Sequence, residues 1–87
     1  MREKIGVQRF GEKLRLLRKR QGMTIMELTT ALGYIGYGYI HAIETGKKKP
    51  TAELVLKAAQ LFGVTTDQLL RDDLEIDTGG NDTASIT

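Results

Sequence analysis

The 87-residue chain has no cysteine, no tryptophan and a single proline. Without cysteine, neither a disulfide framework nor a thiolate metal site can form. No apolar run approaches the roughly 20 residues of a membrane span, and the start of the chain, MREKIGVQRFGEKL, has no apolar stretch typical of a signal peptide. We therefore expect a soluble cytoplasmic protein, and the length allows one small domain with a modest core.

The charges are unevenly distributed along the chain. Residues 1–50 contain eleven Lys and Arg against four Asp and Glu, whereas residues 51–87 contain two against seven. A basic half suggests a polyanionic partner such as nucleic acid. A solvated lysine-rich surface would give the same count, so charge alone does not decide between them.

Four segments have the apolar spacing of amphipathic helices. In the first, Phe10, Leu14 and Leu17 form one stripe. The second begins with T-x-x-E at Thr24 and the last with T-x-x-Q at Thr65, and both are sequence signatures of a capping box. These helices are expected at residues 9–21, 24–32, 51–62 and 65–70.

The segment 33–46, GYIGYGYIHAIETG, contains four glycines and three tyrosines, which by propensity favour a loop or a hairpin. However, Ile40 and Ile43 have helical spacing, and Gly46 is suited to end a helix. We therefore expect a helix of about nine residues at 37–45, with Gly36 as its N-cap. Two short helices joined by a tight glycine turn form a helix-turn-helix, and the domain is predicted to be all-α with five helices.

Both ends of the chain lack a helical pattern. Residues 72–87 are acidic at first and then rich in Gly, Ser, Thr and Asn, which is typical of a disordered tail. Residues 1–8 are expected to be a flexible arm. The folded domain is thus predicted to span residues 9–71.

Residues 10–70 resemble the lambda-repressor-like, Cro-type helix-turn-helix family, also called XRE. The matching pieces are FGEKLRLLRKRQGMTIMELTTALG and IHAIETGKKKPTAELVLKAAQLFGVTTDQLL. The resemblance implies a five-helix lambda-repressor-like domain that regulates transcription by binding double-stranded DNA within the nucleoid. It also implies a homodimer on a roughly palindromic operator, because members of the family commonly pair two half-sites.

The resemblance also assigns roles to individual residues. The start of the second helix of the motif contacts base edges in the major groove, and the residues around it contact phosphates. Base contacts are implied for Tyr37, Gly38, His41 and Ala42, phosphate contacts for Thr24, Tyr39, Thr45, Lys47, Lys48 and Lys49, and a buried ion pair for Arg18 and Glu44. We expect the dimer surface at Leu69, Leu70, Leu74 and Ile76.

The chain departs from the family pattern at three places. The turn at residues 33–35 is one residue longer than usual, and Ile25 stands where a polar residue usually contacts phosphate. Gly38 and Ala42 occupy positions where Gln, Arg, Asn or Ser are common. Tyr and His can hydrogen-bond, but they lack the bidentate match of Arg to guanine or Gln to adenine, so base reading could rest on DNA shape.

A second function remains open from the residues alone. The tyrosine-rich segment would suit a protein interface, so the chain could be an interaction module such as an antitoxin or an adaptor. An enzyme is not expected, because no nucleophile–base or metal constellation is present. His41 is the only histidine, and the acidic residues after Arg71 lack the EF-hand pattern. We therefore expect no cofactor and no metal.

Overall fold

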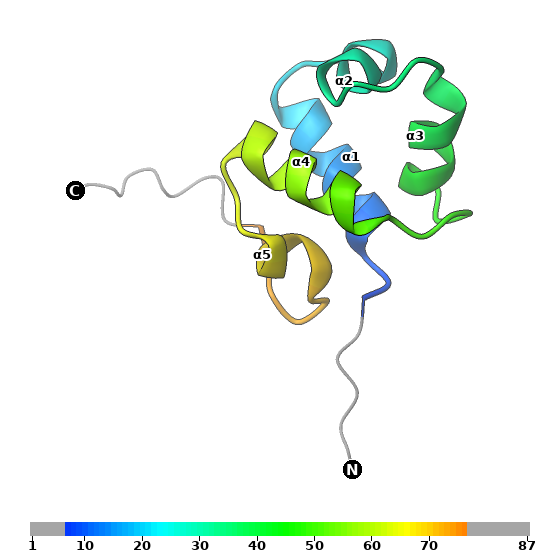
Figure 1. Cartoon of the computed structure of the whole chain (residues 1–87). Helices are drawn as coiled ribbons and strands as arrows, with labels where there is room; N and C mark the ends of the chain where they lie inside the picture. Colours follow the sequence, from blue (N-terminus) through cyan, green and yellow to red (C-terminus); the bar gives the residue numbers. More distant parts are fainter. Residues whose placement is uncertain (1–6, 77–87) are drawn as a thin grey trace, which may run out of the picture.

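The computed structural model describes residues 7–76, which contain five helices and no strand. The predicted all-α fold is confirmed (Figure 1). The helices are α1 (Phe10–Arg20), α2 (Ile25–Ala31), α3 (Tyr37–Glu44), α4 (Ala52–Phe62) and α5 (Thr66–Leu70).

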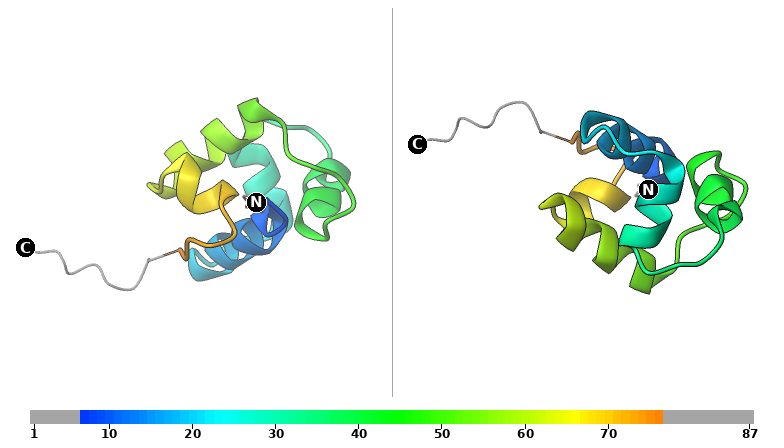
Figure 2. Two further views of the ribbon diagram at one scale, coloured as in Figure 1. Left: turned by 90° about the horizontal axis from the view of Figure 1, so that it is seen from below. Right: turned by 90° about the horizontal axis from the view of Figure 1, so that it is seen from above.

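Helix α1 occupies the middle of the arrangement. It packs against α3 on one side and α5 on the other, while α2 contacts α3 and α4 contacts α5. Both views in Figure 2 show α3 at one margin of the molecule, on the side away from α5. Helix α3 therefore has one face toward the bundle and one face toward solvent.

One side chain from each helix meets the others in the core. Each of these five is fully buried, and each lies on the apolar stripe of its own helix: Leu14, Leu28, Ile40, Leu54 and Leu69. Ile43 lies one turn from Ile40 and is also buried. The inner face of α3 is therefore the one that its isoleucine spacing predicts.

Capping boxes set the first residues of two helices, as their sequences predict. The Thr24 hydroxyl accepts from the Glu27 amide at 3.0 Å, and the Glu27 carboxylate accepts from the Thr24 amide at 2.8 Å. Thr65 and Gln68 form the same reciprocal pair at the start of α5. Each box satisfies two amides that a helix start otherwise leaves without partners.

A buried lysine fastens the chain after α5 to α1. The Nζ atom of Lys13 donates to the carbonyls of Gln68, Arg71 and Leu74 at 2.6, 2.6 and 2.7 Å, and the residue is only 1% exposed. Burial lowers the pKa of the Lys13 ammonium, and so does nearby Arg9, while the negative charges of the carboxylates around it oppose the shift. The three carbonyls use all the donors of a charged ammonium.

The predicted domain boundary at residue 71 is wrong, because the next five residues also pack on the domain. The carboxylate of Asp72 accepts from the amides of Gln8 and Arg9 at 2.9 and 2.8 Å. The Arg9 guanidinium in turn pairs with Glu75 at 3.1 Å, and Ile76 is buried. Asp72 and Glu75 thus tie this segment to the two residues that precede α1. The rest of the expected tail, residues 77–87, and residues 1–6 of the expected arm lie outside the described residues.

Helices α1 and α3 approach each other closely at Gly11. A Cβ atom on Gly11 would collide with the Ile43 carbonyl oxygen and would lie 3.0 Å from the Glu44 carbonyl oxygen. Both obstacles are backbone atoms, which cannot rotate away as a side chain can. Glycine at this position therefore allows the backbones of α1 and α3 to lie this close together.

We expect Gly11→Ala to lower the free energy of unfolding by about 1–3 kcal/mol, the range typical of overpacking in a well-packed core. Urea unfolding followed by circular dichroism measures the change. Gly38→Ala is the matched control, because a Cβ there meets nothing within 4 Å. The control should stabilise the fold by up to about 1 kcal/mol, since alanine is the better helix former. Equal midpoints for Gly11→Ala and the wild type would contradict the close approach.

Candidate nucleic-acid interface

The turn that leads into α3 is held by two aromatic rings. Gly33 lies just after α2, and its φ of +86° allows the Tyr34 amide to donate back to the Thr29 carbonyl at 3.0 Å. The Tyr34 ring then packs against the Tyr39 ring, with centroids 5.2 Å apart. The ammonium of Lys57, from α4, lies 5.0 Å from the centroid of the Tyr34 ring, within the range of a cation–π contact.

The outer face of α3 carries the residues that were expected to contact bases. Tyr37 is 53% exposed, and Gly38 and His41 are also exposed, whereas Ala42 is partly buried. No Asp, Glu, Lys or Arg occurs from residue 28 to residue 43. The face is therefore accessible and carries no charged side chain.

Most of the residues expected to contact phosphates lie at or after the C-terminal end of this uncharged face. The three lysines of residues 47–49 are exposed in the loop after α3. The amides of Lys47 and Lys48 both donate to the Ala42 carbonyl, at 2.8 and 3.2 Å, so the loop is tied to the end of the helix. Thr45 is exposed, with its hydroxyl donating to the His41 carbonyl at 2.9 Å, and Tyr39 is partly buried by its contact with Tyr34.

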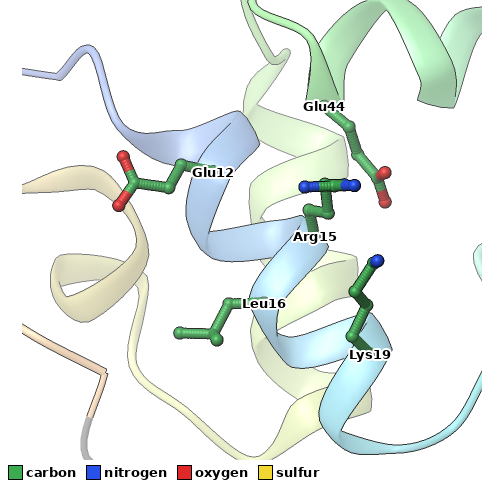
Figure 3. A pocket seen from close by; sticks show the side chains of 5 residues that line it. All are labelled: Glu12, Arg15, Leu16, Lys19 and Glu44. Carbon is green, nitrogen blue, oxygen red and sulfur yellow. The ribbon is translucent and has the colours of Figure 1, made fainter.

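A surface hollow lies where α1, the start of α2 and α3 meet. It adjoins Thr24 and His41 and also contains Arg15, a cation that the sequence did not single out for this site. A second pocket, which shares Arg15 and Glu44 with this hollow, is shown in Figure 3, where Arg15 and Lys19 extend from α1 toward Glu44. The hollow is lined by Arg15, Arg18, Thr24, Ile25, His41, Glu44 and Thr45.

Arg18 and Glu44, which were expected to pair, are in contact through two hydrogen bonds. The guanidinium donates to the two carboxylate oxygens from Nε at 2.8 Å and from an Nη at 3.1 Å. The remaining Nη donates to the Met23 carbonyl at 3.0 Å. The side chains of Arg18 and Glu44 are 13% and 2% exposed. One guanidinium thus links α1, the loop before α2 and the last residue of α3.

The acidic residues near the end of the domain are paired with basic residues. Hydrogen bonds from Arg9 lower the pKa of the Glu75 carboxyl, and hydrogen bonds from Arg71 lower that of Asp73. By contrast, within residues 7–76 Arg15, Lys19 and the three lysines of residues 47–49 form no ion pair. The unpaired positive charge therefore lies on α1 and after α3.

Two of the four residues expected at a dimer surface belong to the core. Leu69 is fully buried and Ile76 is 8% exposed within a single chain, so neither can form an interface with a second copy; this prediction is wrong. Leu69 faces inward because it is the apolar anchor of α5, and Ile76 packs because Lys13 and Asp72 hold its segment in place. Leu70 and Leu74 are partly exposed.

Neither a metal-binding cluster nor a membrane-spanning helix occurs in the part of the chain that the structure describes. Among residues 7–76, no group of three His, Asp or Glu side chains could hold a metal ion. Within the same range, no helix has the length and apolar character needed to cross a membrane.

Comparison with known proteins agrees with this geometry. The profile of a family described as a helix-turn-helix domain matches residues 9–73. The chain belongs to this helix-turn-helix family. A search among curated protein sequences found no match.

Solved structures of regulators share the fold of this helix-turn-helix chain. The restriction-modification controller protein C.AhdI from Aeromonas hydrophila is 25% identical, with a TM-score of 0.64 over 74% of this chain and 96% of the other. The P22 c2 repressor, solved with a synthetic operator, is 25% identical, with a TM-score of 0.67 over 74% and 96%. The clp gene regulator ClgR from C. glutamicum is 27% identical, with a TM-score of 0.63 over 77% and 86%.

We expect Glu44→Ala to lower the free energy of unfolding by about 3 kcal/mol, because the substitution leaves the mostly buried Arg18 guanidinium without its carboxylate. Urea denaturation measures the midpoint. Glu12→Ala is a suitable control: Glu12 also pairs with an arginine, Arg9, but its side chain is 65% exposed. The control should cost at most about 1 kcal/mol. If both variants unfold at the wild-type midpoint, the Arg18–Glu44 pair does not hold α3 in place.

Proposed function

We propose that this chain is a sequence-specific transcriptional regulator that binds double-stranded DNA with α3 in the major groove. Base edges would be contacted by Tyr37, Gly38, His41 and Ala42. Phosphates would be contacted by the lysines of residues 47–49 together with Thr24, Tyr39 and Thr45. Arg15 joins this second group because it lines the same hollow as Thr24.

The observation that carries the proposal is the distribution of charge around α3. Its inner face is fixed in the core by Ile40 and Ile43, and its outer face is exposed and uncharged. Unpaired cations lie beyond it on α1 and in the loop 47–49. An exposed uncharged face bordered by cations suits a major groove, where base edges lie beside the phosphate backbone. Membership in the helix-turn-helix family and the likeness to the P22 c2 repressor, solved with an operator, support it.

A homodimer on two half-sites is part of this proposal. One small domain covers little DNA surface, and two copies about one helical turn apart would place both α3 helices on the same side of the duplex. Leu70 in α5 and Leu74 in the segment after it remain available for such a contact, because both are partly exposed.

A protein-interaction module, such as an antitoxin or an adaptor, is the second candidate. The observation that favours it is the exposed apolar surface at the start of α3, where Ile35 is 95% and Tyr37 is 53% exposed. Such a module would bind a partner protein with the same face. It would not require the cations of Arg15 and of residues 47–49.

Binding isotherms on specific and scrambled duplexes at several salt concentrations separate the two candidates. Lys48→Ala should weaken binding to both duplexes and reduce the salt dependence by about one counterion. Tyr37→Ala and His41→Ala should instead reduce the difference in binding free energy between the specific and the scrambled duplex. We expect a reduction of about 1 kcal/mol for each variant, which is the low end for a base contact. Arg71→Ala is a control for the loss of a cation away from this face, because Arg71 follows α5 and pairs with Asp73.

If all the variants lowered both affinities equally, α3 would not read bases. If the wild type bound neither duplex at low salt, the interaction module would become the better account.

A further inference from the structure

Two glycines at the start of α3, the N-cap Gly36 and Gly38 in the first turn, do not use a backbone conformation that only glycine can adopt. Gly36 has a φ of −102°, which any residue can adopt, and Gly38 lies in regular helix. A glycine inside a helix costs about 1 kcal/mol relative to alanine. A Cβ at either position would meet nothing within 4 Å, so the fold itself leaves room for a side chain. Glycine at such a place is typical of a close approach between the backbone and a ligand.

The side chains beside these glycines are apolar and exposed. Ile35 is 95% exposed and Tyr37 is 53% exposed, on either side of Gly36. The turn offers Ile35 no place in the core, because Tyr34 packs there against Tyr39 instead. The first turn of α3 therefore offers a ligand bare backbone with an aliphatic group and an aromatic ring next to it.

The side chains of residues 33–46 limit the kind of ligand that this segment can bind. From residue 33 to residue 46 there is no Arg, Lys, Asn or Gln, so no side chain can make the bidentate contacts that read guanine or adenine. The major groove offers one apolar group for recognition, the 5-methyl group of thymine. The lysines of residues 47–49 after the segment and Arg15 on α1 suit the flanking phosphates.

We propose that Ile35 and Tyr37 recognise thymine through its 5-methyl group, with Gly36 and Gly38 letting the α3 backbone approach the base pairs. This inference rests on the proposed function, since it requires α3 to enter the major groove. It names the feature of the operator that is read: a thymine near the start of α3 in each half-site.

The experiment begins with a duplex selected by the full chain from a random-sequence DNA pool. Each thymine of the duplex is then replaced, one at a time, by deoxyuridine, which removes only the methyl group and keeps base pairing. Dissociation constants are measured for the wild type, Ile35→Ala and Lys48→Ala. Ile35 is almost fully exposed, so its replacement should leave folding intact, and circular dichroism checks this.

For the wild type, deoxyuridine at one or two positions per half-site should weaken binding by about fourfold for each methyl group that becomes buried. Ile35→Ala should bind the thymine and deoxyuridine duplexes with equal affinity at one of these positions. Lys48→Ala should bind more weakly overall and keep the fourfold preference for thymine.

Two results would overturn the inference while leaving DNA binding in place. One is equal wild-type affinity for every thymine and deoxyuridine pair, and the other is an undiminished preference for thymine in Ile35→Ala. If the chain selected no sequence and bound no duplex, the proposed function would fail as well, and the inference with it.

Discussion

The position of α3 depends on its contact with α1. Gly11 lets the two helix backbones approach, because any side chain there would collide with the carbonyl oxygens at the end of α3. Two turns further along α1, the Arg18 guanidinium binds the Glu44 carboxylate and the carbonyl before α2. A steric limit and a charged pair thus act on the same helix end. Together they set the distance and the orientation of α3, and with them the direction of its outer face.

The rest of the domain supports α1. Lys13 and Asp72 join α1 to the chain that follows α5, one through a buried ammonium and the other by accepting from amides at the start of the helix. These contacts, with the Arg9–Glu75 and Arg71–Asp73 pairs, use the acidic side chains of residues 72–76. Positive charge is therefore left without partners near α3, where an anion would gain most from it.

Much of the fold could be predicted from local patterns. The isoleucine spacing in α3 and the two capping boxes are short-range signals, and the structure places these residues as expected. Lys13 and Asp72 could not be predicted in this way, because their partners lie more than fifty residues away. The same reason explains why Leu69 and Ile76 were assigned to a surface: an apolar residue near a chain end does not reveal whether its own domain covers it.

The candidate site likewise combines residues that local patterns predict with residues that only the folded chain brings together. The exposed lysines and the outer residues of α3 follow from helical periodicity. Arg15 could have been found from its place off the apolar stripe of α1, but its nearness to Thr24 and His41 depends on how three helices meet. Nothing in the sequence distinguishes Ile35 from an apolar residue of the core. It is exposed because Tyr34 takes the inward position in the turn.

The central claim is that α3 is held by its inner face and presents its outer face to DNA. The most direct test is an NMR titration of the full chain with a selected duplex, followed through the backbone amides. The account predicts that the largest shifts occur in residues 36–42, in the loop 47–49 and around Thr24, while α4 and α5 change little. Large shifts confined to α4 and α5, with α3 unaffected, would contradict it.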